Sequence, residues 1–312
     1  MEEKILGLHH ITAIAGNAQR NYEFYTKVLG LRFVKKTVNF DDPGTYHFYY
    51  GNETGEPGTI LTFFPWGNIG RGHVGTGMAT EIGYSVPEGS LDFWEDRFKQ
   101  HNVSYSTRGE RFGEIFLPFR DPDGLNINLI IPKNSDKRKP WETAEIKKET
   151  ATKGFHNVTL MLNKKDDTEK VLIDIFGYRF LSRDDNRYRY ITDTVENASI
   201  IDIIESPEGK RGINAGGTNH HVAFRVKDEA TQMAFREILV RDYLQVTPKI
   251  NRDYFYSIYF REPGGVLFEI ATENPGFTVD EPLADLGRHL KLPAQYESVR
   301  KDIEKSLPVL QY

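Results

Sequence analysis

The strongest constraint on the fold is an internal repeat, because the same order of predicted elements occurs four times along the chain. Each copy opens with a strand, continues with an amphipathic helix and closes with three short alternating strands. The opening strands read LHHITAI, TEIGYSV, GFHNVTLML and NHHVAFRV. Four βαβββ modules in two pairs predict an α+β fold.

The segments between the modules predict how the chain is divided. A polar and strongly charged stretch separates the second module from the third, and it is typical of a linker. We therefore expect a first domain of modules 1 and 2 over residues 5–135, a linker over 136–152 and a second domain of modules 3 and 4 over 153–275. A partly helical tail is expected over 276–312.

Composition excludes several classes of protein. The net charge of -5 argues against a nucleic-acid surface, and no apolar run approaches the ~20 residues of a membrane helix. The start MEEKILGLHH lacks the apolar core of a signal peptide, so we expect a cytoplasmic protein. The chain has no cysteine. Any metal must therefore be held by histidine or by oxygen donors.

No nucleotide cofactor is expected. The stretch GRGHVG fits the spacing of a dinucleotide fingerprint, but it continues into a predicted strand. The fingerprint must open a helix for the phosphate to meet helix N-terminal amides.

Two features resemble a known superfamily. Four βαβββ modules over about residues 5–275 resemble the vicinal oxygen chelate superfamily, which includes glyoxalases, bleomycin resistance proteins and extradiol dioxygenases. The stretch YFREPGGVLFE, residues 259–269, is similar to the end of the extradiol dioxygenase signature. SIYFREPGG and EPLADLGRHLKLPAQYE resemble the bacterial ring-cleaving dioxygenases linked to hydroquinone detoxification. The resemblance implies mixed sheets curled into half-barrels, with metal ligands on the first and last strand of a module.

The resemblance also implies where the metal ligands lie. The first-strand positions are His10, Glu81, Asn157 and His221, and the last-strand positions are Thr62, Asn128, Asp202 and Glu269. Only modules 1 and 4 supply histidine, and only module 4 adds glutamate. His10, His221 and Glu269 would form a facial triad of two histidines and one carboxylate, which is typical of non-haem Fe²⁺ oxygenases. We expect Fe²⁺, with Mn²⁺ as the alternative.

This triad requires strands of modules 1 and 4 to form one half-barrel, whose hollow inner side we call a cup. The alternative takes the first histidine from module 3 and gives His156, His221 and Glu269. His156 stands one residue before the expected position, and a shift of one residue turns a strand side chain to the other face. By the same alternation, His9 and His220 are expected on the opposite face of their strands, either in a structural role or as residues that support the metal ligands.

Three further residues are candidates for the chemistry. Tyr259 is expected to hydrogen-bond a substrate oxygen, although it is also one of several aromatic residues on its strand. The extradiol signature carries a histidine shortly before this strand, where the present chain has Asn251 and Arg252. Arg252 cannot shuttle protons near neutral pH but can stabilise an anion. His47 is a candidate for proton transfer, and Phe64, Trp66 and Phe277 are candidates for an apolar wall.

The expected function is an Fe²⁺-dependent, extradiol-type ring-cleaving dioxygenase that acts on hydroquinone- or catechol-like phenols and O₂, in aromatic catabolism or quinone detoxification. The alternatives are a glyoxalase-like metal-dependent isomerase or thiol transferase, and a metal-free protein that binds an aromatic compound. We expect neither a nucleic-acid nor a membrane partner, and we leave a homodimer open.

Overall fold

The four repeated modules appear in order in the computed structural model, which describes residues 4–242 and 244–312. Module 1 comprises β1 (Leu8–Ala15), α1 (Ala18–Glu23) with a π-helical turn over Phe24–Val28, β2 (Arg32–Asn39), β3 (Asp42–Gly51) and β4 (Ile60–Pro65). Module 2 comprises β5 (Met78–Ser85), α2 (Leu91–Gln100), β6 (Gly109–Arg111), β7 (Glu114–Arg120) and β8 (Asn126–Ile130).

The second half repeats this order. Module 3 comprises β9 (Gly154–Leu162), α3 (Asp166–Lys170) with a π-helical turn over Val171–Ile175, β10 (Arg179–Asp184), β11 (Arg187–Ile191) and β12 (Ile200–Glu205). Module 4 comprises β13 (Thr218–Val226), α4 (Glu229–Arg241), β14 (Ile250–Asn251), β15 (Phe255–Arg261) and β16 (Leu267–Pro275). The tail has short 3₁₀ turns at Phe277–Val279, Leu283–Asp285 and Ala294–Val299, followed by α5 (Arg300–Ser306).

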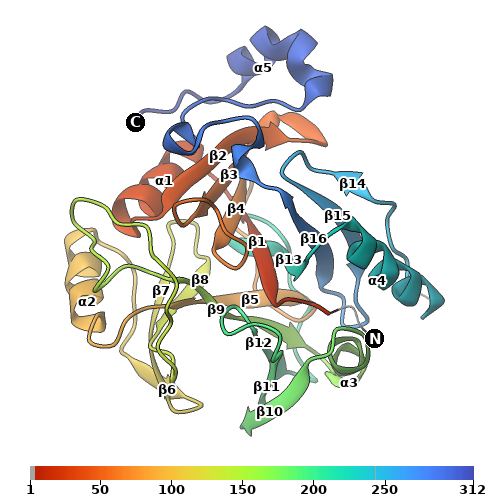
Figure 1. Ribbon diagram of the computed structural model, residues 1–312. Helices are drawn as coiled ribbons and strands as arrows, with labels where there is room; N and C mark the ends of the chain where they lie inside the picture. The colour runs from red at the N-terminus through yellow and green to blue at the C-terminus, as the bar shows by residue number, and fades with distance from the viewer. Residues whose placement is uncertain (1–3, 243) are drawn as a thin grey trace.

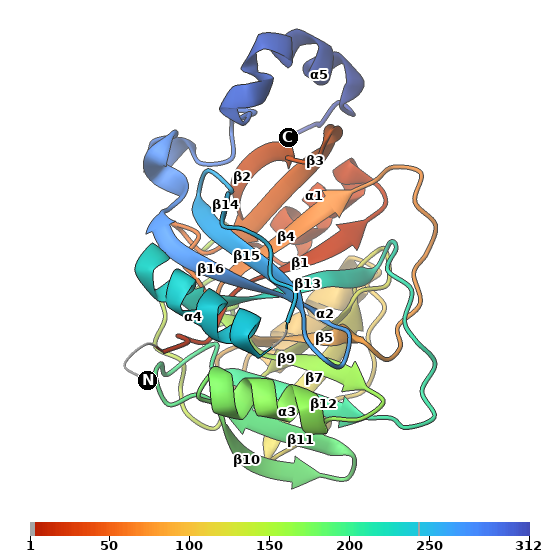
Figure 2. The ribbon, with the colours of Figure 1, turned by 90° about the vertical axis from the view of Figure 1, so that its right-hand side faces the viewer.

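Two eight-stranded mixed sheets form the body of the molecule. The first has the order β14-β15-β16-β13-β1-β4-β3-β2, and the second has the order β10-β11-β12-β9-β5-β8-β7-β6. Figure 2 shows the first sheet above the second, with α3 and α4 on the outside. Each sheet joins two modules through a central antiparallel pair, β1 with β13 and β5 with β9. This architecture confirms the predicted fold class.

The sheets pair module 1 with module 4 and module 2 with module 3. The chain thus brings its first and last modules together, as the choice of His10, His221 and Glu269 requires. Each sheet takes one module from either half of the sequence. The division into consecutive domains at 5–135 and 153–275 stays a prediction, and the sheets do not follow it.

Local sequence explains where the helices begin and end. Asn17 caps α1 by accepting a hydrogen bond from the backbone N–H of Arg20 at 2.8 Å, and Asp228 caps α4 in the same way through Thr231 at 2.9 Å. Gly30 follows the first helix with a φ of 66°, a conformation that favours glycine. Phe235 and Leu239 of α4 are buried and form part of the large apolar core.

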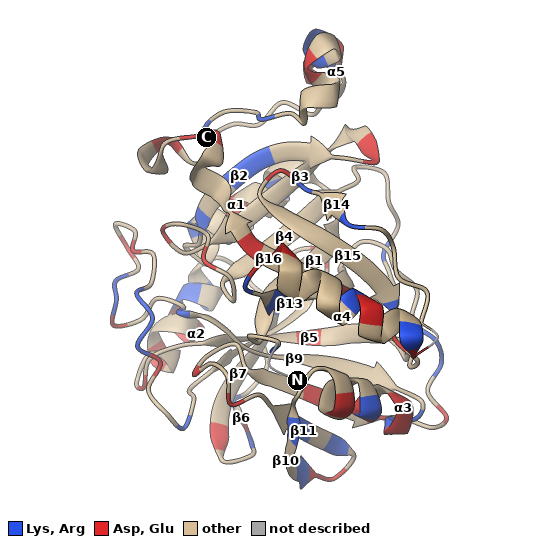
Figure 3. Cartoon of the chain, turned by 45° about the vertical axis from the view of Figure 1, so that its right-hand side comes forward, with Lys and Arg blue, Asp and Glu red and all other residues tan. Residues whose placement is uncertain are grey.

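The tail covers the open edge of the first sheet (Figure 1). Lys35 on β2 is fully buried, and its Nζ lies 2.7 Å from carboxylate oxygens of both Asp280 and Glu281. Acidic and basic residues are interspersed along α3, α4 and α5 (Figure 3). In the described part of the chain, no helix is long and apolar enough to cross a membrane.

Candidate metal centre

The two histidine pairs lie at irregularities in the central strand pair of the first sheet. The antiparallel register between β1 and β13 skips His9 on one strand and His220 on the other. Such bulges re-aim side chains and are frequent beside active sites. Here the two rings of each pair meet, with an Nδ1–Nδ1 distance of 2.9 Å between His9 and His10 and of 2.8 Å between His220 and His221.

These contacts correct one expectation. Simple alternation would turn His9 and His220 away from His10 and His221, but the extra residue in each bulge breaks that alternation. His9 and His220 therefore adjoin the cluster instead of facing the opposite side.

The structure brings His10, His221 and Glu269 together from the adjacent strands β1, β13 and β16. Their donor atoms all lie within 4.8 Å of one another. The Nε2 atoms of His10 and His221 are 3.3 Å apart, and Oε2 of Glu269 lies 3.2 Å and 2.9 Å from them, respectively. All three side chains are buried.

The donor set fits a divalent transition metal. Oε2 of Glu269 is buried and receives no hydrogen bond of acceptable geometry, although two imidazole nitrogens are close to it. Burial lowers the pKa of His221 even though Glu269 raises it, so the ring is neutral and offers a lone pair. Burial opposes the ionisation of Glu269, but His10 and His221 outweigh it and hold the pKa of Glu269 well below its usual range. Two imidazoles and one carboxylate suit such an ion.

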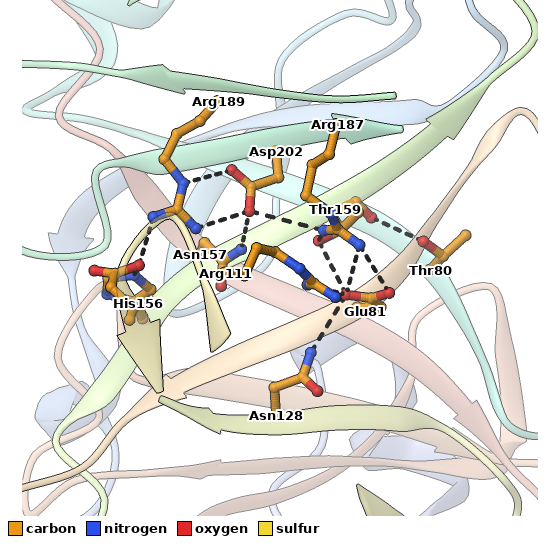
Figure 4. Close-up of polar contacts among 11 residues, drawn as sticks. Thr80, Glu81, Arg111, Asn128, His156, Asn157, Thr159, Arg187, Arg189 and Asp202 are labelled. Atoms are coloured by element: carbon orange, nitrogen blue, oxygen red, sulfur yellow. Dashed lines mark hydrogen bonds and ion pairs between the residues drawn. The ribbon is translucent and has the colours of Figure 1, made fainter. Parts of the chain in front are cut away.

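The equivalent positions of modules 2 and 3 are occupied by an ion-pair network in the second sheet (Figure 4). Arg187 and Arg111 each place a guanidinium nitrogen 3.1 Å from the carboxylate of Glu81. Arg189 donates from Nε to Oδ1 of Asp202 at 2.8 Å. Because arginine side chains already pair with both carboxylates, this cup does not offer free donors to an ion.

The alternative first ligand, His156, belongs to that network. It lies on β9, and its Nε2 is 3.0 Å from Oε2 of Glu114. The cluster of His10, His221 and Glu269 does not include it.

An aromatic-lined cavity of about 230 Å³ opens beside the triad. An apolar cavity of about 150 Å³ admits benzene, so this space is sufficient for a substituted single ring. The aromatic residues that line it are Phe40, Tyr49, Phe64, Trp66, Phe255 and Tyr259. Phe64 and Trp66 are where the sequence predicted an apolar wall. Phe277 is not part of that wall, because it stacks on Tyr254 at a centroid distance of 5.1 Å in the adjoining core.

Tyr259 and Arg252 form one unit at the cavity. Nε of Arg252 donates to the hydroxyl of Tyr259 at 3.2 Å, and the ring of Tyr259 meets that of His221 at 5.7 Å. Burial and the negative charge of Glu269 raise the pKa of Tyr259, so the phenol keeps its proton. Because the arginine occupies a lone pair of the hydroxyl, the hydrogen of that hydroxyl is available to a bound molecule.

His47 also lines the cavity, but both of its ring nitrogens are engaged. Nε2 lies 2.9 Å from the hydroxyl of Thr62, and Nδ1 lies 2.9 Å from the hydroxyl of Tyr49. Burial and the neighbouring His10 lower the pKa of His47 well below its usual value. A neutral ring with two protein partners is suited to hold Thr62 and Tyr49 in place.

Sequence reasoning missed two residues that support the triad. Ser257 donates to Oε1 of Glu269 at 2.5 Å, and it stands two residues before Tyr259 on the same face of β15. That period-two relationship was the available signal. Phe255 packs against the rings of His9 and His10 at 5.0 Å each, which no local pattern indicates.

Comparison with known proteins supports the resemblance seen in the sequence. Residues 7–129 match the model of the Glyoxalase/Bleomycin resistance protein/Dioxygenase superfamily. MhqO of Bacillus subtilis, provisionally named a ring-cleaving dioxygenase, is 44% identical over 98% of this chain and 97% of its own length. A chlorohydroquinone/hydroquinone 1,2-dioxygenase of Sphingobium indicum is 35% identical over 98% of this chain and 97% of its own.

Solved structures agree with these matches. A Bacillus subtilis protein provisionally described as a dioxygenase aligns with a TM-score of 0.95 and 43% identity over 99% of this chain and 98% of its own. Glyoxalase I of Zea mays, at 14% identity and a TM-score of 0.65 over 91% of this chain and 97% of its own, shares the fold. The chain therefore belongs to the glyoxalase, bleomycin resistance protein and dioxygenase superfamily, in the family that contains MhqO.

Proposed function

We propose that this protein is an Fe²⁺-dependent, extradiol-type ring-cleaving dioxygenase for hydroquinone- or catechol-like phenols, with a role in aromatic catabolism or detoxification. The observation that carries the proposal is the buried cluster of His10, His221 and Glu269 beside an aromatic-lined cavity. The names of full-length relatives, a ring-cleaving dioxygenase and a hydroquinone dioxygenase, support the same reaction class.

The three proposed ligands leave open positions on a metal. Fe²⁺ held there would bind a phenolic oxygen and O₂ and would pass electron density from the bound phenolate to O₂. The protein contributes the geometry, because three donors on adjacent strands of one sheet are fixed before the substrate arrives.

Tyr259 and Arg252 are proposed to act on the substrate directly. The hydroxyl of Tyr259 donates a hydrogen bond to a substrate oxygen, and Arg252 holds that hydroxyl in place from the other side. The guanidinium also offsets the negative charge of a bound phenolate. His47 acts through Tyr49 and Thr62, since both of its nitrogens are occupied.

The aromatic wall orients the ring and excludes water. Phe64 and Trp66 lie at a centroid distance of 5.3 Å from each other on one side of the cavity. Flat apolar surfaces favour a planar ring over an aliphatic substrate of similar volume.

The proposal is tested by loading the protein with Fe²⁺ without oxygen and then measuring O₂ uptake with hydroquinone and catechol. We expect one O₂ consumed per ring opened, with both atoms of isotopically labelled O₂ retained in the product. A parallel sample loaded with Mn²⁺ tests the alternative metal. His221→Ala should abolish uptake, whereas His101→Ala, at an exposed histidine at the end of α2, should not change it. A fully loaded protein that consumes no O₂ with any diphenol contradicts the proposal.

The alternative, a glyoxalase-like isomerase or thiol transferase, is disfavoured by Thr62. Such sites usually add a carboxylate ligand at this position of the partner module. Here the hydroxyl of Thr62 lies 2.7 Å from that of Thr12 and 2.9 Å from His47. Thr62 is thus held within a hydrogen-bonded chain and adds no carboxylate to the triad.

A further inference from the structure

The nitrogen that faces away from the cluster decides whether a histidine can bind a metal. A ligand imidazole needs a lone pair on the metal-facing nitrogen and therefore carries its hydrogen on the other one. In most metal sites a carboxylate, a backbone carbonyl or a water accepts that hydrogen. Here the Nδ1 atoms of His10 and His221 face another imidazole instead, at 2.9 Å and 2.8 Å.

The chain of hydrogen bonds through His9 has only one workable direction. Nε2 of His9 lies 3.1 Å from the carbonyl oxygen of Thr272, which can only accept, so that nitrogen carries a hydrogen. If Nδ1 of His9 also carried one, the ring would be a positive charge buried without a carboxylate in contact, which is costly. Nδ1 of His9 is therefore an acceptor, and Nδ1 of His10 donates to it. The lone pair of His10 then lies on Nε2, toward Glu269 and His221.

Close packing holds this chain of hydrogen bonds in place. His9 and His10 are each only 2% exposed, and the ring of Phe255 packs on both. Water cannot replace His9 as the acceptor without displacing that packing.

The second pair, His220 and His221, has no backbone acceptor comparable to the carbonyl oxygen of Thr272 among the described residues. His220 is half-buried, borders the cavity and meets the edge of Phe64 at a centroid distance of 5.8 Å. Among the described residues, none accepts a hydrogen bond from its Nε2. On this side of His221, no described residue beyond His220 holds a hydrogen on Nδ1. On the other side, Oε2 of Glu269 can only accept and lies 2.9 Å from Nε2 of His221, which favours a hydrogen on Nε2 in the metal-free protein.

We infer that His9 is a positioning residue that holds His10 in the tautomer required for metal binding before any metal arrives, whereas His220 exerts no comparable control over His221. The inference rests on the proposed metal site. It explains why a second histidine precedes His10 on β1, and it assigns unequal roles to His9 and His220.

The direct test is ¹⁵N NMR of histidine-labelled, metal-free protein. We expect His10 to carry its hydrogen on Nδ1 alone, and His221 to carry its hydrogen on Nε2 in a substantial fraction of the molecules, because Nε2 faces Glu269. In His9→Leu, His10 should become a mixture. In His9→Asn, whose amide oxygen can take the place of the accepting nitrogen, the single tautomer should return. A single tautomer of His10 that persists in His9→Leu overturns the inference.

The second test is metal affinity, measured without oxygen by competition with a chelator. We expect His9→Leu to weaken Fe²⁺ binding about 10–100-fold, His9→Asn to recover most of that loss, and His220→Leu to weaken binding less than about fivefold. Equal losses in His9→Leu and His220→Leu would contradict the unequal roles. Wild-type protein that binds no metal would refute the proposed function instead, while the NMR result still decides the tautomer.

Discussion

His10 and His221 are 211 positions apart in the chain, yet their Nε2 atoms lie 3.3 Å from each other. They meet because β1 and β13 are antiparallel neighbours at the centre of one sheet, which joins the first module to the last. The second sheet repeats this architecture with arginine–carboxylate pairs in the corresponding place. One of the two similar cups thus brings together three candidate metal ligands, whereas the carboxylates in the other pair with arginine side chains.

Glu269→Gln separates the role of the carboxylate from its volume. The amide keeps the shape of the side chain but removes the charge that a cation needs, so we expect Fe²⁺ to raise the melting temperature of wild type and not that of the variant. The metal-free variant should be at least as stable as the metal-free wild type, because a buried charge has been removed. Thermal melts with and without Fe²⁺ check both points.

The matched control is Glu114→Gln in the second cup, where the carboxylate contacts His156 and Arg189. Glu114→Gln should lower the melting temperature of the metal-free protein, and Fe²⁺ should still raise the melting temperature of this variant. If Fe²⁺ still raises the melting temperature of Glu269→Gln, Glu269 is not a metal ligand.

Tyr259→Phe tests the hydrogen bond to the substrate. Loss of one donor aimed at developing charge should lower kcat about 100-fold while Fe²⁺ affinity stays unchanged. Arg252→Gln should lower kcat by a smaller factor, because Tyr259 keeps its hydroxyl. Tyr256→Phe, on the same strand, is the control and should behave as wild type. Steady-state O₂ uptake with separate metal titrations distinguishes these outcomes, and equal kcat values for Tyr259→Phe and Tyr256→Phe would exclude the role.

His156→Ala tests the alternative triad. The side chain contacts Glu114 in the second cup, so its removal should cost about 1.5–3 kcal/mol in the free energy of unfolding through one lost charged hydrogen bond. Metal affinity should not change. Chemical denaturation and a chelator competition measure the two quantities, and a loss of metal binding would return His156 to the list of ligands.

Much of the architecture was predictable from residue identity at repeated positions. The four-module repeat gave the element order, and only modules 1 and 4 carry histidine at the first-strand position. Pairing of those two modules follows if one site is to hold two histidines. The cup-facing position of Tyr259 follows from its pairing with Glu269 across β15 and β16.

The remaining features depend on contacts between distant strands. The bulges at His9 and His220 arise from the register between β1 and β13, which no local pattern encodes. Hence alternation gave the wrong face for both rings. The cavity wall from Phe255 and Tyr49 likewise requires strands of two modules to meet. Consecutive modules also suggested consecutive domains, whereas the sheets combine modules across the linker.

The buried carboxyl group of Asp121 is expected to make the stability of the protein depend on pH, independently of the metal centre. The carboxylate is buried and accepts hydrogen bonds from Tyr25 and from the backbone N–H groups of Asp123 and Leu125. Burial raises its pKa from 3.8 to about 6. Because the folded state holds the proton more tightly than the unfolded state, its stabilising contribution is complete below pH 3.8 and is lost as the pH rises through about 6.

Asp121→Asn replaces this acid with a group that cannot ionise but can still accept from the two backbone N–H groups. Relative to wild type, the variant should therefore gain up to about 3 kcal/mol in the free energy of unfolding between pH 4 and pH 7.5. Urea denaturation at several pH values measures the difference, in which the titration of all other groups cancels. Asp96→Asn, an exposed site on α2, should give a flat difference within about 0.5 kcal/mol. If the Asp121→Asn difference is also flat, the carboxylate has an ordinary pKa, and its three hydrogen bonds compensate fully for burial.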